Sequence, residues 1–578
     1  MNPGRDNLVF TDALLGRLAA LGVRFAVCSP GSRNTPLVVS AWRCPGIKVL
    51  VAPDERGACY LAAGAAKSSG VPTALICTSG TAAANYLPGV VEASLSGVPI
   101  ILLTADRPPE LRDSGAPQAI DQVKLYGSHV RWSHDAGVPG STRIPVHEYA
   151  DSLAVRAYAL SSGYPRGPVH LNLPFQQPFL PDDIPPFREP AQVLHAESPF
   201  TYADSGALEA VEGLLRTHER GWIVCGPIDD DSLSLAESLQ SLAQYAGYPI
   251  LADAAAPVRF GPGSSLAAGA YDALLRISAL EDNLAPSVVL HFGAAPSSKV
   301  LQQFLHRRRP VEVVFDSGLR WTDPGLRGKI HIRGPAAAFL KALNDRIGDI
   351  RAENPWGARF LEYNRRTQNL LDRHFESSAG FHEPAVAAAV IKGLPPGAQL
   401  FVSSSMPIRD LDWFGGTRTA PLKVLANRGA NGIDGILSSA LGAAAASSAP
   451  TYLLTGDLAC LHDLNALVSA RLNELSLTVV LINNDGGGIF RHLPIASRKD
   501  PFLDPCFYVR HGLSMEPLVR GFGVEYRRPE NTQTLREALA DPPAGVQVLE
   551  ITTSADAAVG ARESAWRLLE RELAGRQD

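Results

Sequence analysis

The sequence has few cysteines, no strong excess of either charge and no long apolar run. Its seven cysteines are scattered over 578 residues, and none forms a Cys-x-x-Cys pair. We therefore expect a reducing compartment, and neither disulfide bonds nor a structural zinc site. No apolar stretch reaches the ~20 residues that a membrane-spanning helix needs, and the first residues lack a signal-peptide pattern. The expectation is a cytoplasmic protein without a membrane span.

The charge balance argues against a nucleic-acid partner. Lysine and arginine number 53 against 58 aspartate and glutamate residues, so the formal net charge is −5. The one dense basic run, His306 to Arg309, is predicted to be the solvated end of a helix. A Gly-x-Gly-x-x-Gly after an early strand, as in a nicotinamide dehydrogenase, is also missing. The composition, 46% hydrophobic and 19% charged, is typical of a globular protein, and the length suggests roughly two to four domains.

Short apolar runs alternate with helical patterns along most of the chain. This alternation predicts three consecutive α/β domains with mostly parallel central sheets, at residues 1–185, 196–350 and 375–556. A proline-rich linker is predicted at 179–199. The first and third domains share a layout of strand ends and turns, which favours a duplication. The expected strands are 23–28, 49–52, 74–78, 100–104, 169–172, 222–225, 250–252, 288–292, 311–315, 400–403, 424–426, 451–454, 478–482 and 546–551.

Two polar motifs follow apolar runs in the third predicted domain. Gly456-Asp457 closes one run, and Asn483-Asn484 closes the next, with Asn484 27 residues after Asp457. This separation fits one strand end, one helix and the next strand end, so the motifs should meet at one edge of a sheet. Hard oxygen ligands placed in this way suit Mg²⁺, which often bridges to phosphates. The run Gly486–Gly488 would let a ligand approach the backbone, and the amides of a helix after Asp457 would face a diphosphate.

Arginines follow apolar runs at four comparable places. Each is expected in a turn after a strand, on the side where α/β sheets bind ligands. Arginine captures carboxylates in a planar, bidentate manner, so four such residues favour a pocket for substrates with several negative charges. Taken singly, each is better explained by a surface charge. The four residues are Arg33, Arg107, Arg409 and Arg428.

The Gly-Asp and Asn-Asn pattern resembles the cofactor-binding motif of thiamine-diphosphate-dependent enzymes. In those enzymes the aspartate, the second asparagine and a following backbone carbonyl hold Mg²⁺. The resemblance therefore implies a Mg²⁺ or Mn²⁺ site at Asp457, Asn484 and Gly486. Leu458 stands where most of these enzymes have glycine, but this position supplies no metal ligand.

The resemblance also implies an activating glutamate at the start of a helix in the first domain. Glu55 in the segment Pro53–Ala58 matches it. In the family this glutamate binds the aminopyrimidine ring of the cofactor and promotes deprotonation of the thiazolium ring. A carboxyl group enclosed there would have a raised pKa and could exchange a proton near neutral pH. The alternative is an acidic residue that merely favours a helix N-terminus.

Further segments between residues 29 and 490 make the resemblance closer. In matching order they are similar to the 2-succinyl-5-enolpyruvyl-6-hydroxy-3-cyclohexene-1-carboxylate synthases of menaquinone and phylloquinone biosynthesis. The middle domain is covered essentially by Ser298-Lys299 alone. The segments are 29–33, 54–57, 78–82, 104–111, 427–430, 432–435 and 486–490.

This closer resemblance implies a fold, a reaction and an assembly. The fold is the thiamine-diphosphate-binding fold, built from three α/β domains. The reaction is a carboligation in which a transferase decarboxylates 2-oxoglutarate and adds the resulting succinyl carbanion to isochorismate. In the family the cofactor lies between domains of two subunits, which implies a homodimer, or a homotetramer built from it.

The same resemblance assigns roles to individual residues. Pro117 and Val300 depart from the asparagine and arginine of some relatives, which puts part of the substrate contacts in doubt. Ile433 would support the bent cofactor, although a plain core contact would look the same. Residues implied to bind the cofactor are Glu55, Ser404, Ser405, Gly432, Ile433, Gly456, Asp457, Leu458, Asn484, Gly486 and Ile489. Those implied to bind substrate are Ser32, Arg33, Arg107, Gln118, Lys299, Ser405, Arg409, Arg428, Phe490 and Leu493.

Two alternatives are kept. Another thiamine-diphosphate 2-oxoacid lyase or synthase would act on smaller or singly charged substrates and would not need four arginines at strand ends. A non-catalytic protein of the same fold would be expected to lack Glu55 or Asp457, and both are present.

Overall fold

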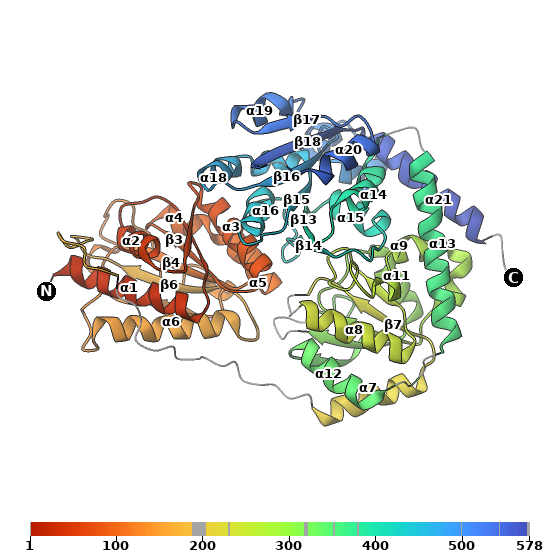
Figure 1. Cartoon of the computed structure of the whole chain (residues 1–578), viewed down its shortest axis with the longest axis horizontal. Coiled ribbons are helices and arrows are strands. Elements are labelled where there is room, and N and C mark those ends of the chain that lie inside the picture. Colours follow the sequence, from red (N-terminus) through yellow and green to blue (C-terminus); the bar gives the residue numbers. More distant parts are fainter. Residues whose placement is uncertain are drawn as a thin grey trace. The chain divides into compact units, whose positions relative to one another are not determined.

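A computed structural model describes residues 2–187, 204–228, 232–316, 322–348, 350, 353–377, 381–498, 500–542 and 544–574. These residues form three sheets of six strands, with helices packed against them (Figure 1). The α/β class with three mostly parallel sheets is thereby confirmed. Residues 188–203, which include much of the predicted linker and the start of the predicted second domain, lie outside the described residues.

The first sheet has the order β2-β1-β3-β4-β6-β5. Strands β3, β4 and β6 are buried along their whole length, which explains why the sequence there is almost continuously apolar. Its strands are β1 (Phe25–Cys28), β2 (Lys48–Val51), β3 (Thr73–Cys77), β4 (Ile100–Asp106), β5 (Ser133–Asp135) and β6 (Val169–Pro174). Its helices are α1 (Pro3–Leu21), α2 (Thr35–Arg43), α3 (Glu55–Ser69), α4 (Thr81–Asn85), α5 (Leu87–Ser96) and α6 (Val146–Ser162).

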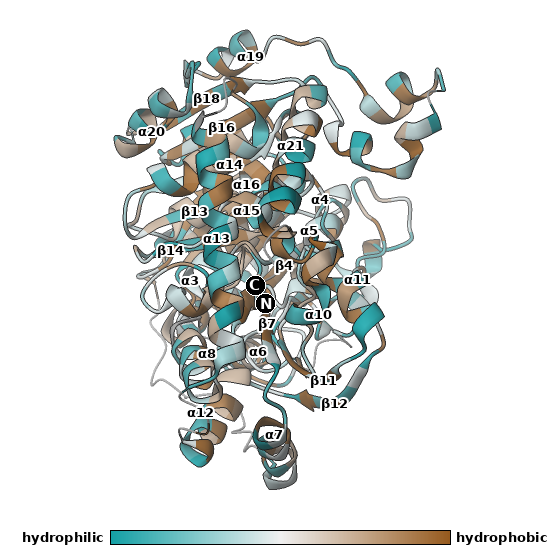
Figure 2. Cartoon of the chain, turned by 90° about the vertical axis from the view of Figure 1, so that its right-hand side faces the viewer, coloured by the Kyte–Doolittle hydropathy of each residue, from teal (hydrophilic) through white to brown (hydrophobic). Residues whose placement is uncertain are grey.

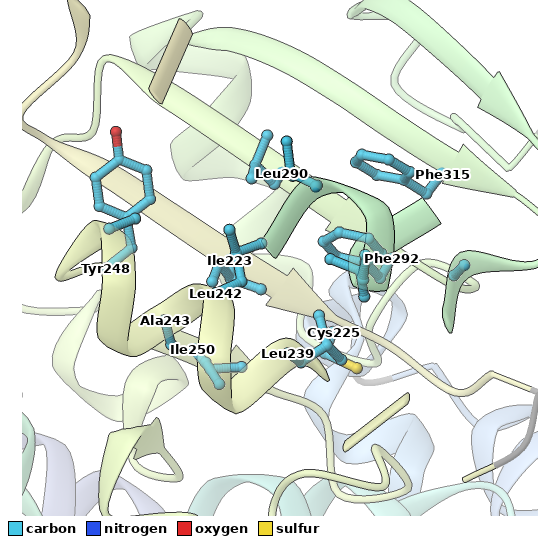
Figure 3. Packing of buried hydrophobic residues seen from close by; sticks show 14 of the residues in the cluster. Ile223, Cys225, Leu239, Leu242, Ala243, Tyr248, Ile250, Leu290, Phe292 and Phe315 are labelled. Atoms are coloured by element: carbon cyan, nitrogen blue, oxygen red, sulfur yellow. The ribbon is translucent and has the colours of Figure 1, made fainter. Parts of the chain in front are cut away.

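The second sheet has the order β12-β11-β10-β7-β8-β9, which is that of a doubly wound dinucleotide-binding fold. Figure 3 shows side chains of its core, in which the rings of Phe292 and Phe315 stack with centroids 4.2 Å apart. Its strands are β7 (Gly221–Cys225), β8 (Ile250–Ala252), β9 (Ala267–Ala268), β10 (Val288–Phe292), β11 (Val311–Asp316) and β12 (Gly328–Arg333). Its helices are α7 (Ser205–Thr217), α8 (Ser232–Ala246), α9 (Tyr271–Leu274), α10 (Glu281–Leu284), α11 (Lys299–Arg308) and α12 (Ala336–Ile347).

The third sheet, β14-β13-β15-β16-β18-β17, repeats the strand order of the first, as the predicted duplication requires. Its strands are β13 (Ala398–Val402), β14 (Leu422–Ala426), β15 (Thr451–Gly456), β16 (Leu477–Asn483), β17 (Glu525–Arg527) and β18 (Val546–Thr552). The helices in this part of the chain are α13 (Pro355–Ser377), α14 (Glu383–Gly393), α15 (Met406–Phe414), α16 (Ile436–Ala445), α17 (Asp457–His462), α18 (Ala466–Leu472), α19 (Met515–Gly521), α20 (Thr532–Ala540) and α21 (Ala555–Ala574).

The strands that the sequence pattern missed all lie at sheet edges. They are β5, β9, β12 and β17. An edge strand is covered by fewer neighbours, so it needs no continuous apolar run, and β9 has only two residues. Strand β12, for example, has no buried residue. The outer helices carry both hydrophilic and hydrophobic residues, as Figure 2 shows for α7 and α12.

The chain divides into two compact units. The first comprises residues 1–199, 427–448 and 461–477, and the second comprises 200–426, 449–460 and 478–578. Within the first unit α16 packs tightly on α3, because glycines remove the side chains that would separate them. A Cβ atom at Gly64 would lie 1.9 Å from the carbonyl oxygen of Ser439, and one at Gly442 would lie 1.9 Å from that of Leu61.

Two simpler expectations are also confirmed. All seven cysteines are free, and six of them are buried. The basic run ends α11, where His306 and Arg307 are exposed.

Among the described residues, no helix combines the length and the apolar character needed to cross a membrane.

Candidate active site

Asp457 connects the two motifs at the carboxyl edge of the third sheet. It follows β15 and begins α17, and its carboxylate accepts hydrogen bonds from the amides of Leu458 and Gly486 at 2.6 and 2.8 Å. Because β15 pairs with β16, the predicted meeting of the motifs is confirmed. Burial raises the pKa of Asp457, and the two amide hydrogen bonds oppose that shift. The Nε2 atom of His511 lies 3.2 Å from Oδ2 of Asp457, a neighbour that no sequence motif indicated.

Asn484 presents an oxygen that has no hydrogen-bond partner. Its Oδ1 atom is buried and unsatisfied, while its Nδ2 atom donates to Oε1 of Glu383 at 2.7 Å. A buried acceptor of this kind is costly unless something binds it. Gly486, with φ of +131°, leaves no room for a side chain, because a Cβ atom would lie 2.1 Å from the carbonyl oxygen of Tyr508. The donor set therefore fits a hard divalent cation such as Mg²⁺.

A buried ionic network lies behind Asn484, and the sequence patterns did not reveal it. Arg562 on α21 donates to the carboxylates of Glu383 and Asp410, and its Nη1 atom donates to His492 at 2.8 Å. All three charged residues are at most 2% exposed. Burial raises the pKa of Asp410 to about 6, against the opposing charge of Arg562.

Arg409 lies in a helix, so its predicted place in a turn is wrong. Helix α15 begins at Met406, with Pro407 in its first turn, and Arg409 is therefore its fourth residue. Proline is well tolerated there because the first amides of a helix have no internal acceptor. Nη1 of Arg409 donates to the backbone oxygen of Ser405 at 2.5 Å. Ser404 is buried and Ser405 has a positive φ of 74°.

The first sheet brings Arg33 and Arg107 together at its own carboxyl edge. Burial and then the nearby charge of Arg107 lower the pKa of Arg33 to about 10. Nη1 of Arg33 donates to the backbone oxygen of Phe175 at 2.6 Å, while its Nε atom is buried without a partner. Two neighbouring guanidinium groups repel each other, and a bound anion would relieve that repulsion.

Gln118 belongs to the same edge. Its Nε2 atom donates to the backbone oxygen of Ser79 at 3.3 Å, and Nη1 of Arg107 donates to the hydroxyl of Ser79 at 3.0 Å. Nη2 of Arg107 also donates to the backbone oxygen of Pro117 at 2.8 Å. Gln118 has a left-handed φ of 57°, which is uncommon for a residue with a side chain and marks a tightly constrained loop. Ser32 is exposed beside Arg33.

Glu55 is the first residue of α3, as the sequence predicted. The preceding residue, Asp54, caps this helix by accepting a hydrogen bond from the amide of Arg56 at 2.9 Å. The Glu55 side chain is half-buried, and its negative charge contributes to the raised pKa of Cys77 at the end of β3. The carboxylate thus lies beside the carboxyl edge of the first sheet.

The loop that carries Arg428, Gly432 and Ile433 is held by a buried glutamate of the first unit. Glu92 accepts hydrogen bonds from the amides of Gly429 and Ala430 at 2.9 and 2.7 Å. Its pKa is lowered, since Lys67 and these amides outweigh the effect of burial. Arg428 and Ile433 are themselves half-buried.

The remaining predicted residues lie in the second unit. Ile489 and Phe490 belong to a short 3₁₀ helix at Gly488–His492, and the ring of Phe490 meets that of Phe507 with centroids 5.3 Å apart. Leu493 follows this helix and is 43% exposed. Lys299 is the exposed first residue of α11, beside the second sheet. Gly456 ends β15 and leaves open space where a Cβ atom would lie.

Family models of known domains match each of the three sheets. Residues 9–125 match "Thiamine pyrophosphate enzyme, N-terminal TPP binding domain", and residues 416–549 match its C-terminal counterpart. Residues 204–402 match "Middle domain of thiamine pyrophosphate". The chain is therefore a thiamine pyrophosphate enzyme in its domain content, and thiamine diphosphate is the cofactor that these domains bind.

Full-length relatives narrow the class. A protein of Chloroflexus aurantiacus is 41% identical over 575 residues, covering 97% of this chain and 96% of its own length. Proteins of Geobacillus kaustophilus and Haloarcula marismortui are 41% and 40% identical, covering 98% of this chain and 98% and 99% of their own lengths. All three are named 2-succinyl-5-enolpyruvyl-6-hydroxy-3-cyclohexene-1-carboxylate synthase. The chain belongs to this family of synthases.

Proposed function

We propose that this enzyme decarboxylates 2-oxoglutarate and joins the four-carbon remainder to isochorismate. The product is 2-succinyl-5-enolpyruvyl-6-hydroxy-3-cyclohexene-1-carboxylate, an intermediate of menaquinone or phylloquinone biosynthesis. Beyond the family membership, the observation that carries the proposal is the pair Arg33 and Arg107 at one sheet edge. Both substrates are dicarboxylates, and guanidinium groups bind carboxylates in a bidentate manner. A lyase for singly charged substrates would not need this pair.

The substrate contacts are assigned by the chemistry of each side chain. Arg33, Gln118, Ser32, Ser405, Arg409 and Arg428 would bind the dicarboxylate derived from 2-oxoglutarate. Arg107 and Lys299 would bind isochorismate, and Phe490 and Leu493 would supply an apolar wall. The hydrogen bonds of Arg107 to Ser79 and Pro117 fix the direction of its guanidinium group, so less entropy is lost on binding.

The second unit would hold the diphosphate of the cofactor through a divalent cation. Asp457, the unsatisfied Oδ1 atom of Asn484 and the backbone oxygen of Gly486 would be its ligands, with Mg²⁺ or Mn²⁺ as the ion. Ser404, Ser405, Gly456, Leu458, Gly432, Ile433 and Ile489 would contact the cofactor itself. Thiamine diphosphate, when bound, supplies the carbon nucleophile that makes decarboxylation of a 2-oxo acid possible.

Glu55 would exchange the proton that activates the cofactor. It is half-buried at the N-terminus of α3, and a carboxyl group is the acid–base group that such an exchange requires. We also propose that the chain acts in the cytoplasm as a homodimer, or as a homotetramer built from it, and that its three domains span 1–185, 196–350 and 375–556.

The proposal is tested by supplying the purified protein with thiamine diphosphate, Mg²⁺, 2-oxoglutarate and isochorismate. Mass spectrometry should find the carboligation product only when all four are present. A protein that ignores isochorismate and turns over pyruvate would instead be a different thiamine-diphosphate lyase.

A further inference from the structure

One buried guanidinium group joins three segments, two of which carry predicted site residues. Arg562 donates to both carboxylate oxygens of Asp410, at 2.8 and 2.5 Å, and also to Oε2 of Glu383 and to Nε2 of His492. Arginine carries five N–H donors in a rigid fork, so these bonds fix the relative positions of α14, α15 and the 3₁₀ helix at Gly488–His492.

Each of these contacts leads directly to the candidate site. Glu383 accepts from Nδ2 of Asn484 at 2.7 Å, Asp410 follows Arg409 in α15, and His492 precedes Leu493. The network therefore reaches the predicted metal ligand through one intermediate side chain.

The hydrogen bond to Glu383 fixes which end of the Asn484 amide faces that side chain. A carboxylate only accepts hydrogen bonds, so the NH₂ end of Asn484 turns toward Glu383. The Oδ1 end then points away, where it is buried without a partner. Arg562 holds the Glu383 side chain in place through their buried ion pair.

We propose that Arg562 and Glu383 are positioning residues for the divalent-metal site, and that they act by holding the Asn484 amide with its oxygen toward the cation. This inference rests on the proposed function, since it takes Asn484 as a metal ligand. Neither residue touches the cation or the substrates. An arginine in the first half of α21 thereby controls metal affinity at the carboxyl edge of the third sheet.

The inference is tested first with Glu383→Gln. The new amide can offer its own NH₂ group to residue 484, which allows the Asn484 amide to turn over and present its NH₂ end to the cation. We expect the Mg²⁺ concentration that half-saturates thiamine diphosphate binding, measured by calorimetry, to rise by roughly ten- to hundredfold. Arg562→Lys keeps the charge but cannot reach all its partners, and it should shift the same value in the same direction.

A second substitution separates positioning from general damage. In the Glu383→Gln background, Asn484→Asp offers oxygen at both ends, so one oxygen can accept from the new amide while the other faces the cation. The double variant should regain most of the lost Mg²⁺ affinity, although Asn484→Asp alone brings two carboxylates together and should weaken it. Arg17→Met is the matched control, because Arg17 is also a buried arginine in an ion pair, with Asp151, but lies in the first unit.

The outcomes discriminate clearly. Unchanged Mg²⁺ affinity in a folded Glu383→Gln variant would overturn the inference, as would a loss that Asn484→Asp does not restore. An equal loss in Arg17→Met would also overturn it, by reducing the effect to destabilisation. If the unaltered protein binds thiamine diphosphate without any need for Mg²⁺, that result contradicts both the proposed metal site and this inference.

Discussion

The backbone amide of Gly486 donates a hydrogen bond to Oδ2 of Asp457 at 2.8 Å. Gly486 follows β16 and Asp457 follows β15, and these strands are neighbours in the third sheet. The hydrogen bond therefore joins the two segments that leave the sheet at its carboxyl edge. It also fixes one carboxylate oxygen, while the amide of Leu458 fixes the other. The carboxylate of Asp457 is thus oriented by two backbone amides, with the His511 side chain as a further neighbour.

Replacing Asp457 tests that orientation. Asp457→Asn would place an NH₂ group where the carboxylate now accepts amide hydrogen bonds, and it would remove the one negative charge of the proposed ligand set. We expect the half-saturating Mg²⁺ concentration for thiamine diphosphate binding to rise by more than about a hundredfold, since even outer ligands of metals contribute ~10–100-fold. Calorimetry provides the measurement. A variant with normal Mg²⁺ dependence would show that the cation binds elsewhere.

Glu55→Gln should separate cofactor binding from turnover. The amide has nearly the shape of the carboxyl group but cannot exchange a proton, so the fold and the thiamine diphosphate affinity should be kept. We expect kcat to fall by roughly 10²–10⁴-fold, the usual contribution of a general acid or base. Near-normal kcat would show that Glu55 does not activate the cofactor.

The two arginines of the first sheet should respond to different substrates. Arg33→Lys and Arg107→Lys keep the positive charge but lose the bidentate fork of the guanidinium group. A hydrogen bond to a charged group contributes about 1.5–3 kcal/mol, so losing one should raise KM by roughly 10–100-fold. Arg33→Lys should raise KM for 2-oxoglutarate, and Arg107→Lys should raise KM for isochorismate. Arg24→Lys is a surface control, because Arg24 is exposed and its guanidinium group donates to the backbone oxygens of Ala19 and Val23. Equal effects on both substrates would contradict the assignment.

Stability should fall in acid because of His291. Burial lowers the pKa of this histidine to about 4, so the folded state prefers it neutral. The resulting stability is fully present above its ordinary pKa of 6.5 and is lost as the pH falls toward 4. Between about pH 8 and about pH 5 this group should account for a loss of roughly 2 kcal/mol in the free energy of unfolding. Urea unfolding of His291→Gln should show a smaller loss, and an unchanged loss would place the effect in other groups.

Apart from the two-residue β9, the strands that are buried along their whole length could be predicted from sequence. Runs such as those at β4 and β16 are continuously apolar because helices bury both of their sides. The edge strands β5, β12 and β17 were not predicted, since most of their residues are partly or fully exposed and their sequence pattern is that of a loop. A continuous apolar run therefore indicates that a strand is buried, and a strand can form without such a run.

The candidate site divides in the same way. Asp457 and Asn484 were singled out because short motifs follow predicted strands at an informative spacing, and Glu55 was singled out by the resemblance to thiamine-diphosphate-dependent enzymes. Glu383 and Arg562 were not, because their partners lie 101 and 179 residues away in the chain and only tertiary packing brings them together. Arg409 was placed in a turn because it follows closely on a predicted strand, although Pro407 also fits the first turn of a helix.

One measurement tests the central claim most directly: whether CO₂ release from 2-oxoglutarate is coupled to the loss of isochorismate. With thiamine diphosphate and Mg²⁺ present, CO₂ from carboxyl-labelled 2-oxoglutarate and the disappearance of isochorismate should be followed together. The account predicts equal amounts of both and little CO₂ without isochorismate. Sustained CO₂ release that leaves isochorismate untouched would contradict it and would identify a simple decarboxylase.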